Sequence, residues 1–271
     1  MNKLTNDNYF STEMNMKYMS SSMFKSFLDC EVMGLAIAKG EYVEKKTPAL
    51  LVGSYVDAYF SNELDKFKQE NPQIFKKDGT LLKDFEKANE IIKAIEDDPM
   101  MMKYLFGEHQ VVMTGIIANV PFKIKVDSLL PYAIVDQKIM SSITELVWKY
   151  DEESKRNKQL NFIKAFGYDI QGAIYQKVVE QNVFEKLPFI LAPTTKEEEP
   201  DKALIELDQE LLDNALKLVE SKAERYDLIK KGIIEPIGCG KCPMCRRLKK
   251  VSRIDRYSEL YGKEENENEN E

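Results

Sequence analysis

The segment from Lys123 to Lys138 constrains the fold of this chain more than any other part of it. It reads K-I-K-V-D-S-L-L-P-Y-A-I-V-D-Q-K, which predicts two strands joined by a tight turn at 130–132. Side chains alternate between the faces of a strand, so Asp136 and Lys138 fall on one face of the second strand. Asp127 ends the first strand. We therefore expect these three charged side chains to converge at one sheet edge.

These residue types suit the hydrolysis of a phosphodiester bond. Carboxylates are the hard oxygen ligands that Mg²⁺ and Mn²⁺ prefer, and a neighbouring lysine can orient an attacking water and help to deprotonate it. By itself the D-x-K triplet is a weak signal, because an aspartate and a lysine two residues apart also form ordinary surface pairs. The surrounding sequence therefore decides how the triplet is interpreted.

The surrounding sequence predicts an α/β fold in which helices flank a central mixed β-sheet. Helical patterns cover 20–39, 49–62, 83–95, 161–181 and 208–231. Strand patterns cover 111–117, 120–127, 133–139, 188–192 and 203–207. The D-x-K strand therefore comes third in a run of strands and is followed by a helix.

The helix predicted at 161–181 has two distinct faces. Apolar residues at three- to five-residue steps form a face toward the core: Phe162, Phe166, Ile170, Ala173 and Val178. The other face carries Lys164, Tyr168, Gln171 and Tyr175. We expect this second face to contact a DNA strand, through the charge of Lys164, an amide hydrogen bond from Gln171 and stacking or hydrogen bonding by the tyrosines.

In this order the motifs resemble those of the PD-(D/E)XK nucleases, and among them the phage recombination exonucleases of the RecE and lambda type. Asp127 takes the place of the family's first catalytic aspartate, and Asp136-Gln137-Lys138 that of its (D/E)-x-K triplet. Gln171 to Tyr175 resembles the Q-x-x-x-Y motif of the RecB-like branch. The resemblance implies a restriction-endonuclease-like core in which Asp127, Asp136 and Lys138 are catalytic.

The resemblance also implies metal ligands and a DNA contact near the N-terminus. Asp127, Asp136 and the Gln137 carbonyl would bind two Mg²⁺ or Mn²⁺ ions per site, with Asp57 as a further ligand where RecB-like members commonly have histidine. The segment Met19–Lys25 resembles the S-x-S start of the family's first helix. The residues expected to contact DNA there are Ser20, Ser22 and Lys25.

The four cysteines form a second distinctive pattern. Cys239, Cys242 and Cys245 have C-x-x-C-x-x-C spacing, and Cys30 lies in the first predicted helix. One early and three late cysteines resemble the set that binds an iron–sulfur cluster in AddB-type nucleases, although the last spacing is shorter here. Four thiolates suit either a [4Fe–4S] cluster or Zn²⁺, and the sequence does not separate them. Reduced thiols without a metal are the third reading.

The formal net charge of −7 argues only weakly against a DNA partner, because the local distribution of charge sets the field at a groove. Part of the acidity lies in a Glu/Asn tail at 263–271 that we expect to be disordered. Basic residues gather around the cysteines, and we expect Arg246 and Arg247 to contact DNA.

Length and composition predict a single nuclease domain over 1–262 in a soluble, cytoplasmic protein. The 271 residues are 43% hydrophobic, which suffices for one large core. No apolar run is long enough to span a membrane, and the N-terminus has no apolar signal region. Trp148 is expected in the core or in an oligomer contact.

Taken together, the resemblance implies a Mg²⁺-dependent exonuclease that digests double-stranded DNA ends 5′ to 3′. It would leave 3′ single-stranded tails for phage homologous recombination by single-strand annealing. Its implied partners are DNA ends, a single-strand annealing protein and further copies of the chain in a ring of three or four, in the cytoplasm of the bacterial host. Two alternatives stay open: an AddB-like nuclease subunit acting with a helicase, and a non-enzymatic, metal-stabilised nucleic-acid-binding protein.

Overall fold

A mixed β-sheet forms the centre of the protein, which a computed structural model describes over residues 3–43, 45, 47–151 and 155–261. Within these residues the strands of this sheet follow the order β1-β2-β3-β6-β7. They are β1 (Glu108–Ile117), β2 (Val120–Leu130), β3 (Ala133–Met140), β6 (Phe189–Thr195) and β7 (Ile205–Glu206). Only β3 and β6 among these neighbours run parallel. The predicted α/β fold with a central mixed sheet is confirmed.

Local sequence explains both kinds of strand connection. Ala118 and Asn119 adopt positive φ angles of 46° and 62°, as a two-residue turn between antiparallel strands requires. The parallel pair β3 and β6 needs a long crossover, which contains α8 (Phe162–Ala165) and α9 (Tyr168–Val183).

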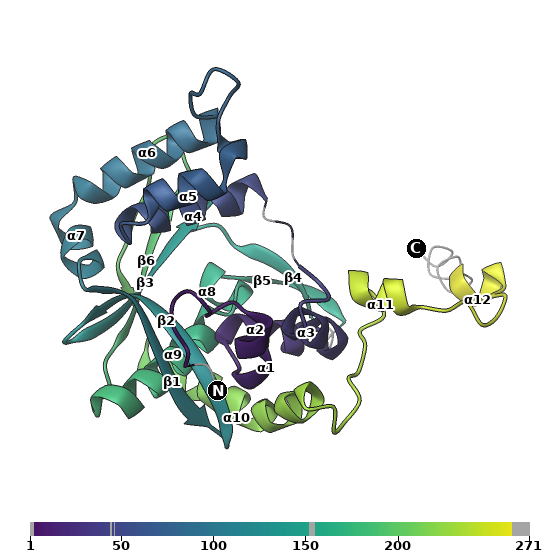
Figure 1. Cartoon of the computed structure of the whole chain (residues 1–271). Helices are drawn as coiled ribbons and strands as arrows, with labels where there is room; N and C mark the ends of the chain where they lie inside the picture. Colours follow the sequence, from purple (N-terminus) through teal and green to yellow (C-terminus); the bar gives the residue numbers. More distant parts are fainter. Residues whose placement is uncertain (1–2, 44, 46, 152–154, 262–271) are drawn as a thin grey trace, which may run out of the picture.

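Helices cover both faces of the sheet (Figure 1). On one face, α2 (Ser21–Asp29), α9 and α10 (Gln209–Lys230) pack on side chains such as Phe122 and Ile134. On the other face, α4 (Pro48–Phe60), α6 (Lys83–Glu96) and α7 (Pro99–Leu105) pack on side chains such as Val135 and Ile190. Strand β3 thus has a core on either side of it, which fixes the direction of each of its side chains.

The helix predicted at 20–39 is in fact two helices, α2 and α3 (Glu31–Ala38). Cys30 separates them in an extended conformation, with φ −167° and ψ 118°. The two helices then pack closely, because a Cβ atom on Gly34 would lie only 2.5 Å from the ring of Phe27. Cys30 therefore lies at a helix junction and not inside a helix.

The helix predicted at 161–181 is also divided. Gly167 has a φ of 63°, a left-handed conformation that ends α8 before α9 begins. Phe166, which we expected in the core, is 44% exposed as a result. The predicted amphipathic face was wrong here because a single helical period does not continue through a left-handed residue.

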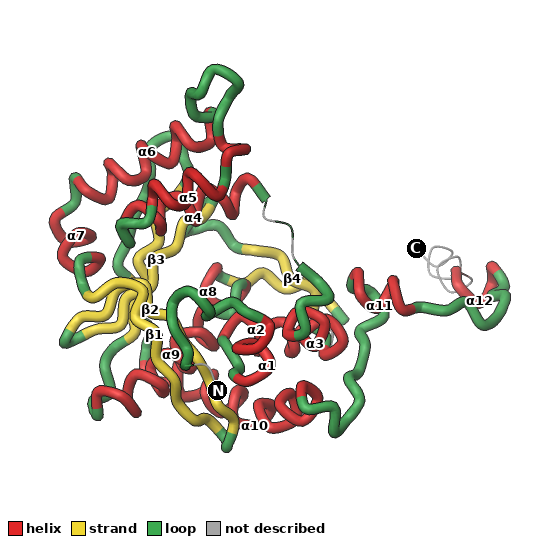
Figure 2. The backbone as a smooth tube through the Cα atoms, viewed as in Figure 1, coloured by secondary structure: helices red, strands yellow, loops and turns green. Residues whose placement is uncertain are grey.

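Several elements were not predicted from the sequence. They are α1 (Thr12–Lys17), α5 (Leu64–Glu70), a 3₁₀ turn (Pro72–Ile74), α7, β4 (Val147–Asp151), β5 (Arg156–Leu160), α11 (Pro243–Leu248) and α12 (Tyr257–Tyr261). Strands β4 and β5 form a separate antiparallel hairpin, shown with the other strands in Figure 2. Trp148 on β4 is 64% exposed, which rules out the core but leaves the alternative expectation, an oligomer contact, as a prediction.

None of the described helices has the length and apolar character needed to cross a membrane. The tail predicted at 263–271 lies outside the described residues.

Candidate active site and cysteine cluster

The three residues of the central motif meet where β2 and β3 separate. Pairing between these strands covers only Ser128–Leu130 and Ala133–Val135. Beyond it, Asp127 Oδ2 accepts a hydrogen bond from the main-chain N–H of Gln137 at 3.0 Å. Because β6 pairs with the other side of β3, the site opens between two neighbouring strands and not at the outer edge of the sheet.

Asp136 is held rigidly at the inner end of this site. Its side chain is buried, and one carboxylate oxygen forms an ion pair with the Lys138 ammonium. The other oxygen accepts a hydrogen bond from Gln171 Nε2 at 2.6 Å. Gln171 on α9 therefore fixes the carboxylate from one side and Lys138 from the other.

An open pocket of about 310 Å³ lies in front of these residues, between α4 and the sheet. Its lining includes Asp57, Asp127, Gln137, Lys138 and Tyr168. Asp57 points in from α4, and its Oδ1 accepts a hydrogen bond from Gln110 Nε2 at 3.1 Å. Four of the sequence-predicted site residues thus share one pocket with Asp136 directly behind them.

Burial and mutual repulsion set the electrostatics of the site. Burial raises the pKa of Asp127, and the negative charge of Asp136 raises it further. Burial also raises the pKa of Asp57, against the opposing effect of Lys125. Burial disfavours the charge on Lys138, yet Asp136 and Asp127 raise its pKa overall. The lysine is therefore an ammonium at neutral pH, and the crowded carboxylates favour an added cation.

The donor set fits a divalent metal ion. The Lys138 ammonium already binds two oxygen atoms of the site: it contacts the Asp136 carboxylate and lies 3.3 Å from the Gln137 carbonyl oxygen. Carboxylate and carbonyl oxygens are hard ligands of the kind that Mg²⁺ prefers. Two buried atoms nearby, Gln137 Nε2 and Gln110 Oε1, have no hydrogen-bond partner among the described residues. Polar atoms of this kind are usually satisfied, so the site is built to receive further polar groups.

The structure changes the expectation for two residues of α9. Gln171 and Tyr175 are 8% and 7% exposed, so they do not form an open face for DNA. The Tyr175 hydroxyl donates a hydrogen bond to the Lys125 carbonyl at 3.1 Å, and Gln171 bonds Asp136. Gln171 and Tyr175 lie on the side of α9 that packs against the sheet. They therefore position groups on β2 and β3 and do not face solvent.

The other residues expected to contact DNA occupy different settings. Ser20 is buried and caps α2 by accepting the Met23 N–H, whereas Ser22 is exposed. Lys25 donates to the Phe166 carbonyl at 3.0 Å, and burial together with Lys138 lowers its pKa to about 8. Lys164 on α8 forms an ion pair with Asp169 at 2.7 Å.

Sequence reasoning missed Gln110, which binds Asp57. The register of β1 and β2 pairs His109 with Ser128 and Val111 with Val126, so Gln110 lies opposite Asp127. The predicted β1–β2 hairpin would have indicated this position if its register had been extended to Asp127.

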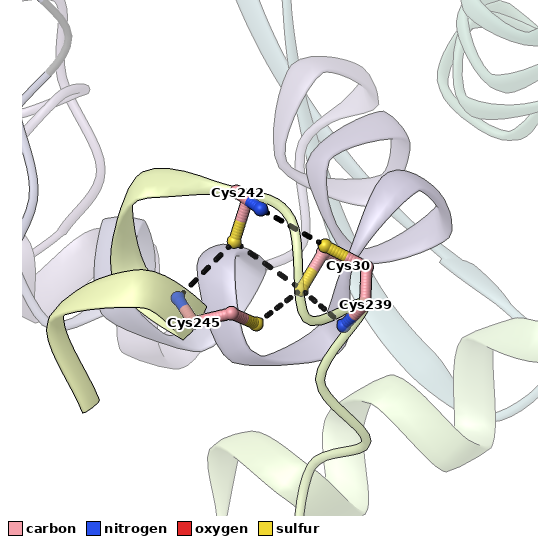
Figure 3. A group of neighbouring side chains, drawn as sticks. All are labelled: Cys30, Cys239, Cys242 and Cys245. Carbon is pink, nitrogen blue, oxygen red and sulfur yellow. Dashed lines mark hydrogen bonds between the residues drawn. The ribbon is translucent and has the colours of Figure 1, made fainter. Parts of the chain in front are cut away.

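The four cysteines converge on one point although Cys30 lies far from the others in sequence (Figure 3). Their sulfur atoms all lie within 4.8 Å of one another. The main-chain N–H groups of Cys239, Cys242 and Cys245 donate hydrogen bonds to cysteine sulfur atoms at 3.3–3.4 Å. Such donors stabilise thiolates, so the cluster suits a soft metal centre.

The thiols of the cluster differ in pKa, and a bound metal would remove this difference. A main-chain hydrogen bond at Lys241 and neighbouring donors lower the pKa of Cys239 to about 7. Burial raises the pKa of Cys242 to about 12 and also raises that of Cys30. A metal centre replaces the thiol protons with positive charge, which would keep all four sulfur atoms as thiolates.

An ion pair beside the cluster ties the same parts of the chain together. Glu31 accepts two hydrogen bonds from Arg225, at 2.6 and 2.8 Å, and a third from the Ile237 N–H at 2.7 Å. The hydrogen bonds from Arg225 lower the pKa of Glu31. Arg246 and Arg247 lie on α11, which is beside α3 (Figure 1).

Comparison with known proteins agrees with this geometry. Residues 20–248 match the family described as a PDDEXK-like domain of unknown function (DUF3799). The chain belongs to this PDDEXK-like family. A crystal structure of a protein from Eubacterium rectale named "Putative exonuclease" is 43% identical, covers 96% of this chain and 98% of that one, and has a TM-score of 0.89. No curated protein matches the chain. The predicted PD-(D/E)XK nuclease fold is confirmed.

Proposed function

We propose that this PD-(D/E)XK nuclease is a Mg²⁺-dependent exodeoxyribonuclease. The observation that carries the proposal is the pocket in which Asp57, Asp127 and Lys138 meet, with Asp136 held behind them. The name of the Eubacterium rectale relative, an exonuclease, supports action at the ends of a nucleic acid. The donor set of three carboxylates and one main-chain carbonyl supports the choice of a hard divalent cation.

The residues of the chain divide the chemical work among them. Lys138, held as an ammonium by Asp136 and Asp127, can orient the attacking water and stabilise negative charge that develops on the phosphate. Gln171 keeps Asp136 in a fixed orientation. When bound by the carboxylates and the Gln137 carbonyl, Mg²⁺ supplies Lewis-acid activation of the phosphate.

The finer proposal concerns the biological role. On the resemblance to RecE and lambda-type enzymes, the protein digests duplex ends 5′ to 3′ and leaves 3′ tails for a single-strand annealing protein. It acts as a ring of three or four copies in the cytoplasm of a phage-infected bacterium. The cysteines hold either a [4Fe–4S] cluster or Zn²⁺, and the close grouping of their sulfur atoms supports a bound metal.

One assay tests the central proposal. Linear duplex DNA carrying a label at the 5′ or the 3′ end is incubated with protein and Mg²⁺ without ATP, and a closed circle serves as control. We expect release of the 5′ label first, no attack on the circle and loss of hydrolysis in Lys138→Ala. Lys177→Ala is a matched control, because Lys177 pairs only with Glu180 on the surface of α9 among the contacts described.

The cysteine cluster gives one specific reason to consider an alternative. Four cysteines in this order resemble the AddB arrangement, in which a nuclease works beside a helicase. Digestion that begins only when a helicase and ATP are added would favour that alternative. DNA binding that survives Lys138→Ala, without hydrolysis by the wild-type protein under any condition, would instead favour a non-enzymatic binding protein.

A further inference from the structure

The β4–β5 hairpin exposes aromatic side chains that the fold does not use. Trp148 and Tyr150 are 64% and 51% exposed and, being two residues apart on β4, point to the same face of the hairpin. Their cross-strand partners on this face are Gln159 and Asn157. The face therefore combines two large rings with amide groups, which differs from the purely apolar face of a protein core.

An unbroken series of contacts leads from the active-site pocket to this hairpin. Tyr168 lines the pocket, and the centre of its ring lies 5.3 Å from the Lys138 ammonium. The ring of Phe166 is 5.9 Å from that of Tyr168, and the Lys149 ammonium is 5.9 Å from the ring of Phe166. Lys149 lies between Trp148 and Tyr150 on β4, so its side chain points to the opposite face of the hairpin, toward Phe166 beside the pocket.

The same series continues to the cysteine cluster. The Lys241 ammonium, in the cysteine segment, lies 5.3 Å from the ring of Tyr150. Figure 1 shows the β4–β5 hairpin running from α8 toward α11. Rings and lysines thus line both faces of the hairpin, with Lys149 on the face toward Phe166 and Trp148 and Tyr150 on the other. We call this set the aromatic strip: Tyr168, Phe166, Lys149, Trp148, Tyr150 and Lys241.

We propose that the aromatic strip binds a single DNA strand that leads into or out of the active-site pocket. Exposed rings with lysines beside them match what a single strand offers, which is a series of unpaired bases beside a chain of phosphates. A paired duplex hides the faces of its bases from such rings. The charge complementarity comes from Lys149, Lys241 and Lys25, whose ammonium donates to the Phe166 carbonyl. The inference rests on the proposed nuclease function and adds the strand that the enzyme holds.

The sequence supplies a direct probe, because Trp148 is its only tryptophan. Lys138→Ala protein, which cannot hydrolyse the probe, is titrated with oligothymidylate in Mg²⁺ while tryptophan fluorescence is recorded. We expect quenching that saturates, because a base stacks on the indole. Tyr150→Ala should weaken this binding by about 5- to 150-fold, the equivalent of about 1–3 kcal/mol per stacked base.

Phe184→Ala is the matched control. Phe184 is 92% exposed but lies at the opposite end of α9 from Tyr168, so its removal should leave the affinity unchanged. An absence of quenching, or an equal affinity in Tyr150→Ala, overturns the proposal. A loss of tryptophan fluorescence on raising the protein concentration in the absence of DNA also overturns it, because the strip would then bind a second copy of the chain.

A substrate without bases separates this proposal from the proposed function. Wild-type and Tyr150→Ala protein should hydrolyse bis(p-nitrophenyl) phosphate at equal rates, because this phosphodiester has nothing to stack on the strip. If Tyr150→Ala slows this reaction as much as DNA digestion, the strip acts on the pocket and the proposal fails. If the wild-type protein quenches with oligothymidylate but hydrolyses neither substrate, the strip stands and the proposed function fails.

Discussion

At the scale of single residues, the active site depends on buried hydrogen bonds that support charged groups. Asp136 is fixed between Lys138 and Gln171, and Asp57 is fixed by Gln110. The side chains that touch the pocket are few, and the side chains behind them that orient the carboxylates come from β1 and α9. Substitution of these supporting residues should therefore affect the reaction without changing the set of charged groups.

Gln171→Ala should lower the rate of hydrolysis by about 10- to 100-fold, as is usual when a group behind a metal ligand is lost. The reason is that Asp136 loses the donor at 2.6 Å and becomes free to turn. The readout is the rate as a function of Mg²⁺ concentration, and we expect the variant to require more Mg²⁺. Gln181→Ala, on the exposed end of the same helix, should behave as wild type. An unchanged Mg²⁺ requirement in Gln171→Ala would contradict a positioning role.

Lys123 gives a prediction about stability and pH. Its side chain is 1% exposed, and its ammonium donates to the Tyr9 carbonyl and to Asn15. Burial lowers its pKa from 10.5 to about 8. Between these values the unfolded chain binds more protons than the folded one, so this lysine makes the free energy of unfolding rise with pH.

The measurement is urea unfolding of wild type and Lys123→Met between pH 7 and pH 10. The difference in unfolding free energy between wild type and variant should shift in favour of wild type above pH 8. A difference that stays constant over this range would show that Lys123 keeps its ordinary pKa in the folded protein.

At the scale of elements, the breaks between helices matter as much as the helices themselves. Gly167 ends α8 with a left-handed residue, and α9 then carries Tyr168 and Gln171 to the site. Cys30 interrupts the N-terminal helices and presents its sulfur atom to the late cysteines. Both breaks place a functional group where a continuous helix would not.

Gly167→Ala should destabilise the protein and slow hydrolysis. The left-handed φ of 63° is strained for alanine, by about 1–2 kcal/mol, and its Cβ would lie 2.8 Å from Lys25 Cδ. Gly232→Ala is the matched control, because its φ is 70° but nothing lies within 4 Å of an added Cβ. Thermal unfolding and DNA digestion are compared for both. Equal effects of the two variants would show that the contact with Lys25 has no consequence.

At the scale of the whole molecule, the cysteine cluster joins the two ends of the fold. Cys30 follows α2, while Cys239, Cys242 and Cys245 follow α10, and the Glu31–Arg225 ion pair lies beside them. A metal held by all four sulfur atoms would close the chain around the face of the sheet that α9 covers. Its loss should therefore loosen the late segment and the aromatic strip that ends at Lys241.

Cys30→Ser and Cys245→Ser should each lose most of the bound metal and lower the melting temperature. The two variants remove ligands from opposite ends of the chain, so one shared centre predicts the same loss from both. Elemental analysis identifies Fe or Zn, and a brown colour marks a cluster. Arg246→Ala, a change in the same segment that leaves the thiols in place, should retain the metal. Full metal content in Cys30→Ser would exclude Cys30 as a ligand.

The sequence by itself determined the order of the main strands and the central motif, because these depend on local alternation. The period of two placed Asp136 and Lys138 on one face, and hydrophobic periodicity located α4, α6 and α10. The hairpin β4–β5 was not predicted because β5, R-N-K-Q-L, is almost wholly exposed and has no apolar alternation to detect.

Only the tertiary structure decided which side of each element faces the site. The separation of β2 from β3 opens the pocket, and the packing of α9 turns Gln171 and Tyr175 inward, away from solvent. The convergence of Cys30 with cysteines more than 200 residues away, and of Gln110 with Asp57, follows from the same packing. The physical reason is that local periodicity records only that a face is buried, while the partner that buries it comes from a distant part of the chain.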